Sequence, residues 1–213
     1  MEDIKNKKIL RPGKIGLYDP IREHDACGIG FVANIKGRES HSIVDNGLEM
    51  LENLEHRGAV GADKSVGDGA GILTKLPDSF FRKELEKKSI KLPVFGKYGV
   101  AMVFFPKNRN LIELSLNIIN KIFKKYQLEV FFNRDVPVNN KILSKKMKDS
   151  APDIKQIFIK HRNHEINSQE LNLKLFLVGK IISNIISKET KKYPSLKLFY
   201  ICSISNSTIN YKG

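Results

Sequence analysis

Two side chains in this sequence are well suited to covalent chemistry, the thiols of Cys27 and Cys202. A thiol has an ordinary pKa of about 8.5, so it needs a neighbouring base to act as a nucleophile at neutral pH. Cys27 lies beside Gly28 at the start of an apolar run, where a small packed core residue is the alternative interpretation. Cys202 lies in an apolar segment near the end of the chain, where we expect a packed and inert thiol. Two cysteines give no disulfide framework and too few ligands for a zinc or iron–sulfur site, so no metal is predicted.

Glycine and aspartate alternate in the segment that precedes the second predicted strand. Gly67, Gly69 and Gly71 do not predict a phosphate-binding loop, because they precede a strand and no Gly-Lys-Ser/Thr follows. We expect a tight loop that lets the backbone pass close to the strand that begins at Cys27. Asp68 could bind a metal or orient a substrate, although capping of a turn is the favoured interpretation.

Arg57 lies at the end of the first predicted helix and faces this loop. We expect it to pair with a loop aspartate or with backbone carbonyls near Cys27, which would shape a pocket without touching substrate. His24 lies three residues before Cys27, but too few further ligands accompany it to form a zinc site. The four other histidines are expected at the surface: His41, His56, His161 and His164.

Length and composition limit the classes of protein to which the chain can belong. Its 213 residues are 41% apolar and 28% charged, which suits one domain or two small ones and excludes collagen, coiled coil and wholesale disorder. No apolar run approaches the eighteen or so residues of a membrane span, and residues 1–14 lack the apolar core of a secretory signal. We therefore expect a soluble, cytoplasmic protein.

The net charge of +14 is unevenly distributed. Residues 1–78 hold 11 basic and 13 acidic side chains, whereas residues 79–213 hold 26 basic and 10 acidic ones, a net charge of +16. Of the 37 basic residues 29 are lysine, which lacks the planar fork that binds phosphates and base edges bidentately. A solvated lysine surface is therefore predicted in preference to a nucleic-acid interface.

Hydrophobic periodicity predicts alternating strands and helices, and hence a mixed α/β or α+β architecture. Strands are predicted at residues 27–34, 72–76, 98–105, 128–132, 156–160, 198–204 and 208–211. Helices are predicted at residues 43–55, from 77–78 onward, and at 111–126, 140–149 and 168–187. The last two strands are expected to form a hairpin through residues 205–207.

Four segments together resemble the amino terminus of the glutamate synthase large subunit. They are LYDP at residues 17–20, EHDACGIGF at 23–31, LEHRGA at 54–59 and GDGAGI at 67–72. The likeness continues more loosely through residues 134–138, 151–156, 201–205, 208 and 211–213. It therefore spans most of the chain and is most specific between residues 17 and 72.

This resemblance implies a class II glutamine amidotransferase, an α+β N-terminal-nucleophile hydrolase built as an αββα four-layer sandwich and incomplete at its C-terminal side. Cys27 would attack the side-chain amide of glutamine and give a thioester, ammonia and then glutamate. The α-amine of Cys27 can serve as base only when free, so a cut after Ala26 would remove residues 1–26 as a propeptide-like arm. Residues 27–213 would then form the first part of the amidotransferase domain, with Gly28, Arg57 and Asp68 as candidates for shaping its pocket.

Other parts of the family's site have no counterpart in this sequence. The Arg-Phe-Ser segment that holds the glutamine carboxylate and the His-Asn-Gly-Glu segment that stabilises the oxyanion are both expected downstream of Gly213. The pair Asn46–Gly47 lies inside a predicted helix and does not replace them. Loss of an oxyanion donor typically costs about 10²–10³ in rate, so we expect the chain to be nearly inactive alone.

The resemblance also predicts what the chain works with. No cofactor is expected in it, whereas FMN and an iron–sulfur cluster would lie on the missing downstream domains. The partners would be glutamine, those synthase domains or a separate chain that carries them, and in some forms a small reductase subunit. Whether the electron donor is a nicotinamide or ferredoxin stays open. The origin of the chain also stays open: it could come from a truncated gene, be part of a split enzyme, or be a fragment of a longer protein.

Two further functions stay open. One is a non-catalytic remnant or binding module that kept the fold and uses its basic surface for an acidic partner. The other is a different class II amidotransferase that feeds ammonia to a sugar, purine or asparagine synthase. The segments around residues 23–27 and 67–71 favour glutamate synthase over this second alternative.

Overall fold

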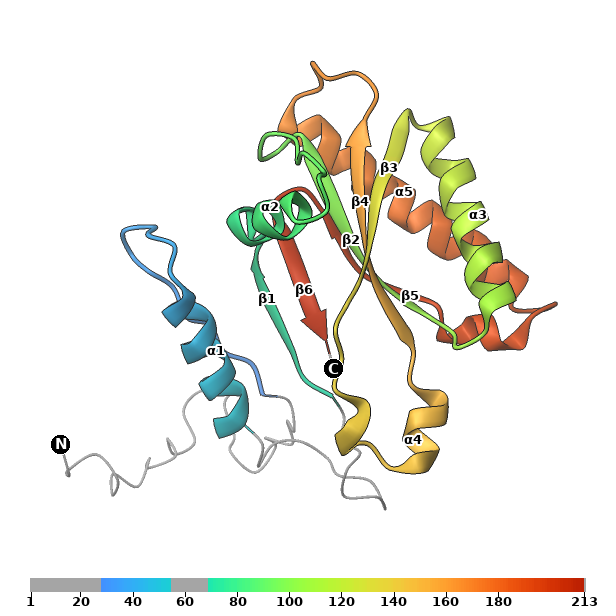
Figure 1. The fold of residues 1–213 in the computed structure, drawn as a ribbon, viewed down its shortest axis with the longest axis horizontal. Helices are drawn as coiled ribbons and strands as arrows, with labels where there is room; N and C mark the ends of the chain where they lie inside the picture. The colour runs from blue at the N-terminus through green and yellow to red at the C-terminus, as the bar shows by residue number, and fades with distance from the viewer. Residues whose placement is uncertain (1–27, 55–68, 213) are drawn as a thin grey trace, which may run out of the picture. The chain divides into compact units, whose positions relative to one another are not determined.

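The structure, a computed structural model, describes residues 28–54 and 69–212 (Figure 1). Its contacts divide the chain into two compact units, residues 1–62 and 63–213, and each is described by itself. In the first unit an extended segment at residues 28–34 leads through a turn into helix α1 (His41–Asn53). Residues 1–27, which include the predicted arm, lie outside the described residues, so its boundary stays a prediction.

The second unit combines antiparallel strands with helices, which confirms the α+β alternative. Its strands are β1 (Gly71–Lys75), β2 (Tyr98–Phe105), β3 (Leu128–Asp135), β4 (Asp153–His161), β5 (Tyr200–Ser205) and β6 (Thr208–Lys212). Its α-helices are α2 (Asp78–Glu86), α3 (Arg109–Lys125), α4 (Lys145–Ser150) and α5 (Ser168–Glu189). A four-stranded sheet has the order β3-β4-β2-β5, and a two-stranded sheet pairs β1 with β6. No helix in residues 28–54 or 69–212 is long and apolar enough to cross a membrane.

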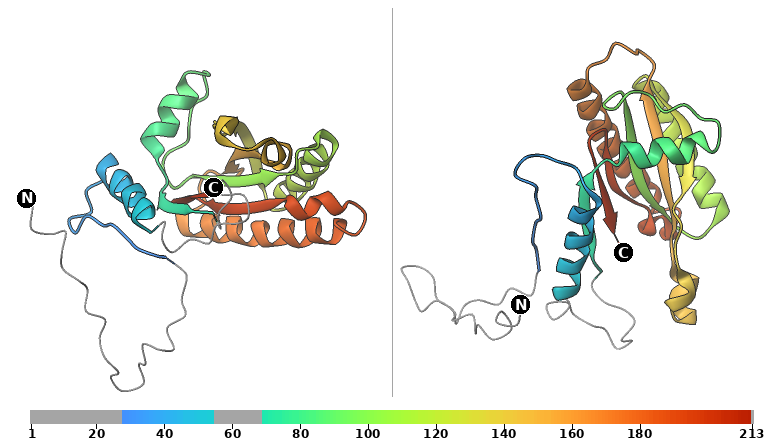
Figure 2. Two further views of the ribbon diagram at one scale, coloured as in Figure 1. Left: turned by 90° about the horizontal axis from the view of Figure 1, so that it is seen from below. Right: turned by 60° about the vertical axis from the view of Figure 1, so that its left-hand side comes forward.

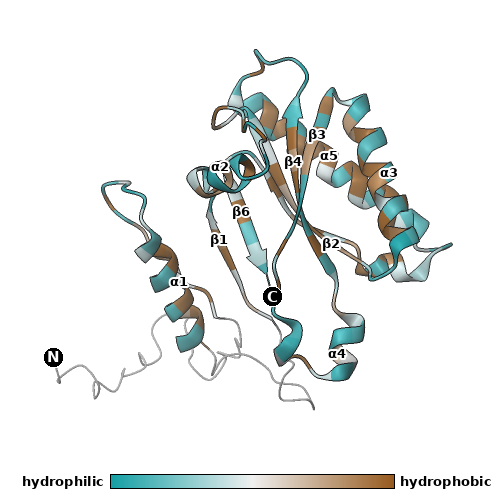
Figure 3. Cartoon of the chain, in the orientation of Figure 1, coloured by the Kyte–Doolittle hydropathy of each residue, from teal (hydrophilic) through white to brown (hydrophobic). Residues whose placement is uncertain are grey.

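Strand β2 lies inside the four-stranded sheet and is apolar along its whole length, as expected of a strand covered on both faces. On one face Ala101, Val103 and Phe105 enter a core formed with α3 and α5, where Ile119 and Leu175 are almost fully buried. Figure 2 shows α5 running along the sheet, and in Figure 3 β2 and β4 carry apolar stretches while α3 exposes a hydrophilic face. These two helices form one layer against the sheet.

The opposite face of the sheet forms a second core. Tyr98, Val100 and Met102 of β2 pack there with Phe81 of α2 and Ile209 of β6. Phe81 and Ile209 are fully buried, and burial of a side chain of this size contributes roughly 1.5–3 kcal/mol. The second unit therefore holds a helix layer, a four-stranded sheet and, beyond it, the two-stranded sheet with α2.

The predicted hairpin of the last two strands is wrong, because β5 pairs with β2 whereas β6 pairs with β1. Residues 205–207 connect two sheets instead of closing a ladder. Asn206 fixes this connection: it is 1% exposed, and its side-chain nitrogen donates to the carbonyl oxygens of Gly96 at 3.0 Å and Ser168 at 2.8 Å. An anchor to residues so distant in sequence cannot be predicted from local turn chemistry.

Two other predicted elements differ from the structure. Residues 28–34 form no strand: Ile29 and Phe31 are 95% and 90% exposed, and no described strand bonds to this segment. Its apolar pattern suits a strand, but a strand forms only where a partner supplies hydrogen bonds. The helix predicted at residues 140–149 is split into a short 3₁₀ turn (Asn140–Ile142) and α4, because the backbone at Ser144 is extended.

We predict that Gly71→Ala weakens the pairing of β1 with β6. A Cβ at this position would lie 2.9 Å from the backbone oxygen of Tyr211, which cannot retreat without disturbing the ladder. The free energy of unfolding should fall by about 1–3 kcal/mol, as measured by chemical denaturation. The control is Leu73→Ala in the same strand, where the side chain is 67% exposed and a change within about 0.5 kcal/mol is expected. Equal effects of the two substitutions would contradict this account.

Candidate functional site

Most residues predicted to form the site lie outside the described part of the chain. Cys27, Arg57 and Asp68 are among them, so their roles stay predictions. Gly28, the residue next to the predicted nucleophile, is the first residue that the structure describes. The surroundings of Gly28 therefore give the nearest structural information on Cys27.

The glycines after Cys27 allow the backbone to lie close against α1. A Cβ added to Gly28 would lie 3.1 Å from a methyl carbon of Leu54, and one added to Gly30 would overlap the sulfur of Met50. Leu54 and Met50 are one helical turn apart and face the same segment. Larger side chains at these positions would require Leu54 and Met50 to shift, so the two glycines allow the segment after Cys27 to lie close to α1.

A tight turn connects this segment to α1. The Asn34 side-chain oxygen accepts hydrogen bonds from the backbone nitrogens of Lys36 at 3.0 Å and Arg38 at 3.2 Å. Gly37 has a positive φ of 67°, which glycine adopts without strain. The helix begins at His41, one residue after Ser40 and two residues before the predicted start at residue 43.

The Asn46–Gly47 pair lies within α1, as predicted. Backbone donors inside a helix are used by the helix itself, so this pair is not available to stabilise an oxyanion. His41, at the start of the helix, forms an exposed pair with Asp45 at 3.0 Å. Its position at the surface confirms the prediction for this histidine.

The described part of the glycine loop leads into β1 and lies close to β6. Gly69 has a positive φ of 85°, and the close approach at Gly71 is to Tyr211 of β6. That the loop passes close to the segment after Cys27, which belongs to the other unit, stays a prediction. Gly67 lies outside the described residues.

Cys202 has the properties of an unreactive thiol, as predicted. It is half-buried on β5, and its sulfur donates to the backbone oxygen of Asn210 at 3.6 Å. Burial raises the pKa of the Cys202 thiol, and the nearby Lys212 charge opposes this only in part. The fraction of thiolate at neutral pH is therefore smaller than for a free cysteine.

His161 is not at the surface, so the prediction for this histidine is wrong. It is 4% exposed at the end of β4, where its Nε2 lies 3.0 Å from the Nζ of Lys174 on α5. His161 follows Ile157 and Ile159 at the spacing of two that places side chains on one face of a strand. That spacing could have predicted its burial, whereas the basic and polar residues after it suggested a surface loop. His164 is exposed, as predicted.

A partly buried polar cluster joins β3, β4 and β6, and sequence reasoning missed it. Arg134 donates to the side-chain oxygen of Gln156 at 3.0 Å and lies 3.7 Å from the carboxylate of Glu84. Gln156 is 1% exposed and also bonds Tyr211, whose pKa is raised chiefly by burial. The pKa of Glu84 is lowered, chiefly by the hydrogen bond that the Lys87 side chain donates to it. The Arg134–Glu84 pair is partly exposed, at 16% and 28%, and links β3 to α2.

Comparison with known proteins identifies the family. The sequence profile of the class II glutamine amidotransferases matches residues 27–213. The chain belongs to this family of enzymes. Membership agrees with the mixed helices and antiparallel sheets of the second unit and gives the chain the fold class of an α+β N-terminal-nucleophile hydrolase.

Several curated relatives of this amidotransferase chain are glutamate synthases. It is 35% identical to ferredoxin-dependent glutamate synthase 1 of Arabidopsis thaliana over 214 residues, which cover the whole chain and 13% of that relative. It is 40% identical to the NADPH glutamate synthase large chain of Bacillus subtilis, over 95% of this chain and 13% of the relative. It is also 40% identical to the NADH glutamate synthase of Saccharomyces cerevisiae, over 95% of this chain and 10% of the relative. The chain thus spans only about a tenth of the length of these enzymes.

We predict that alkylation of Cys202 in the folded amidotransferase chain is slow at pH 7–8 and rises steeply only at higher pH. The raised pKa means that the thiolate forms at higher pH than in a free cysteine, and partial burial restricts access. Peptide mapping by mass spectrometry after iodoacetamide treatment would measure the rate. The same chain in denaturant is the control, and an equal rate at pH 7.5 in both states would contradict the assignment.

Proposed function

We propose that this chain is the glutamine-hydrolysing part of a glutamate synthase and that Cys27 is its nucleophile. The thiolate of Cys27 attacks the side-chain carbonyl carbon of glutamine, and the C–N bond breaks as ammonia leaves. Water then hydrolyses the thioester to glutamate and restores the thiol. In the whole enzyme the ammonia would pass to 2-oxoglutarate.

The observation that carries this proposal is the point at which the family match begins, at Cys27 itself. A nucleophile that is the first residue of the mature protein has a free α-amine beside its thiol. An amine of pKa about 7.7–8 can accept the thiol proton and return it to the leaving ammonia. While Ala26 is attached, the same nitrogen is an amide and is not basic, so the proposal requires removal of residues 1–26.

The structure of the neighbouring residues supports this assignment. The glycines at 28 and 30 allow the segment after Cys27 to lie close to α1. The other cysteine, Cys202, bonds a backbone oxygen and has a raised pKa. Cys27 is therefore the better candidate of the only two thiols in the sequence.

The remaining chemistry of a glutamate synthase would reside outside these residues. An iron–sulfur cluster does not fit this chain, because two cysteines cannot supply its ligands. Among the described residues, no three His, Cys, Asp or Glu side chains come together as a metal site. We infer that FMN and the cluster are carried by other synthase domains or by a separate chain. The relatives named above use ferredoxin, NADPH or NADH at similar identity to this chain, so the electron donor is not specified here.

The site assignment can be tested with an electrophilic analogue of glutamine. In the full-length enzyme or the reconstituted complex, we expect the label at Cys27, complete loss of labelling in Cys27→Ala and normal labelling in Cys202→Ala. Peptide mapping locates the label, and ammonia release measures the loss of activity. The 213-residue chain alone should label at least about 10²-fold more slowly, because oxyanion donors are missing. Labelling at Cys202 would overturn the assignment.

The processing step gives a separate prediction. Amino-terminal sequencing of the active enzyme should begin at Cys27, because only the cleaved form has a free amine beside the thiol. The rate of labelling should increase with pH up to about 8 as that amine loses its proton. The comparison is Ala26→Pro, a change at the residue before the scissile bond that we expect to block the cut and leave the enzyme inactive. A fully active enzyme that still carries Ala26 would contradict the mechanism.

A further inference from the structure

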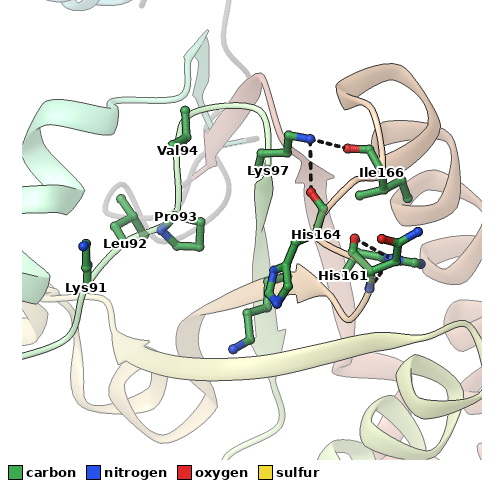
Figure 4. A pocket seen from close by; sticks show the side chains of 10 residues that line it. Lys91, Leu92, Pro93, Val94, Lys97, His161, His164 and Ile166 are labelled. Carbon is green, nitrogen blue, oxygen red and sulfur yellow. Dashed lines mark hydrogen bonds between the residues drawn. The ribbon is translucent and has the colours of Figure 1, made fainter.

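The second unit contains a pocket that the proposed glutamine chemistry does not use. It has a volume of about 530 Å³ and lies between residues 91–97, before β2, and residues 160–166, at the end of β4 and beyond it. Figure 4 shows Lys91, Leu92 and Pro93 on one side and His161 and His164 on the other. A cavity of this size is typical of sites for small molecules.

A side chain of α2 holds the loop at residues 91–97, which forms one wall of the pocket. Arg82 donates to the backbone oxygens of Leu92 at 2.9 Å and Pro93 at 3.1 Å. The same guanidinium group donates hydrogen bonds to the carboxylate of Asp78. This carboxylate also accepts a hydrogen bond from the hydroxyl group of Tyr98, with 2.8 Å between the two oxygens. Burial and this bond raise the pKa of Tyr98, so the hydroxyl stays a donor. The loop is therefore held in place by groups that are themselves partly buried.

The opposite wall is fixed by a lysine and a histidine. The Nζ of Lys97 donates to the backbone oxygens of His164 at 3.1 Å and Ile166 at 2.8 Å, and it closes the loop after β4 (Figure 4). The ring of His161 lies 3.0 Å from Lys174 through one nitrogen and 3.0 Å from the backbone nitrogen of Asn163 through the other. Both walls are thus held before any ligand arrives, which lowers the entropic cost of binding.

The pocket carries positive charge without an acidic lining residue. Its ten lining residues, all described, include three lysines and two histidines but no Asp or Glu. Lys91 forms no ion pair with any described residue, and Lys160 has only a distant one, 3.8 Å from Glu129. Lys97 uses two of its three N–H donors on carbonyl oxygens, which leaves one.

Part of the lining is apolar and suits a carbon skeleton. Leu92 is 3% exposed and Ile166 is 5% exposed, and both line the pocket together with Pro93 and Val94. Charged groups alone would suit an inorganic ion, whereas this combination favours an organic molecule with an anionic end. We propose that the pocket binds a small organic anion, with its carboxylate or phosphate group facing the lysines and its apolar part against residues 92–94.

Three probes separate the parts of this proposal. Phenyl phosphate and phenylacetate share a ring but differ in the anionic group, and inorganic phosphate lacks the ring. Each is titrated into the full chain at low salt while the imidazole resonances of His161 and His164 are followed by NMR. We expect saturable shifts with at least one organic anion, at a dissociation constant of about 1 mM or below, and at least about tenfold weaker binding of inorganic phosphate.

Variants of the full chain show whether the pocket is the place where the organic anion binds. Lys91→Met with Lys160→Met should weaken binding about tenfold, whereas Lys121→Met, at an exposed position on α3, should change it less than twofold. If the double variant loses its dispersed NMR spectrum and is therefore unfolded, the single variant Lys91→Met replaces it. Its affinity for the organic anion should fall about threefold.

Several outcomes would overturn the proposal. They are the absence of saturable shifts with both organic anions at about 10 mM, an equal loss of binding in Lys121→Met, and equal affinity for inorganic phosphate. The titration is repeated with Cys27→Ser, which should bind unchanged. Failure of the proposed glutamine chemistry would therefore leave this test unaffected.

Discussion

The second unit depends on one constraint, the burial of β2 on both of its faces. Alternate side chains of this strand enter two different cores, so the position of the strand fixes both at once. Val103 faces α3 and α5, whereas Val100 and Met102 face α2 and the two-stranded sheet. A one-residue slip in register would exchange these two sets, and the eight paired positions with β4 oppose such a slip.

Buried polar groups then decide how the loops lie around these cores. Asn206 holds the connection between β5 and β6 against the start of α5, and Arg82 holds the loop before β2. Each of these side chains satisfies backbone oxygens that a loop would otherwise leave unpaired. The same bonds that support the fold also hold open the pocket between residues 91–97 and 160–166, so the basic pocket follows from the way in which the loops are anchored.

The proposed nucleophile depends on a different kind of constraint, one of backbone access. Glycines at positions 28 and 30 let the segment after Cys27 lie close to the side chains of Leu54 and Met50 on α1, and a larger residue there would require these side chains to shift. A nucleophile that uses its own α-amine has its base attached by covalent geometry. On the proposed mechanism the fold would have to position a chain terminus at Cys27, and the close contacts at Gly28 and Gly30 lie just after that position.

The sequence by itself determined the elements with strong periodicity and the family. The predicted bounds of β2 and the predicted start of α5 are those of the structure, and the other ends of α3 and α5 differ by one or two residues, because buried strands and amphipathic helices repeat at fixed spacing. The motif segments around Cys27 indicated the amidotransferase family, and the family match confirmed it.

Only the tertiary structure decided which strands pair and where a pocket forms. The expected hairpin became two strands of different sheets because Asn206 bonds residues 38 and 110 positions away in the chain. The ring of His161 meets Lys174 of α5, a partner that its spacing on β4 does not predict. These contacts join residues far apart in sequence, and local propensity contains no information about such partners.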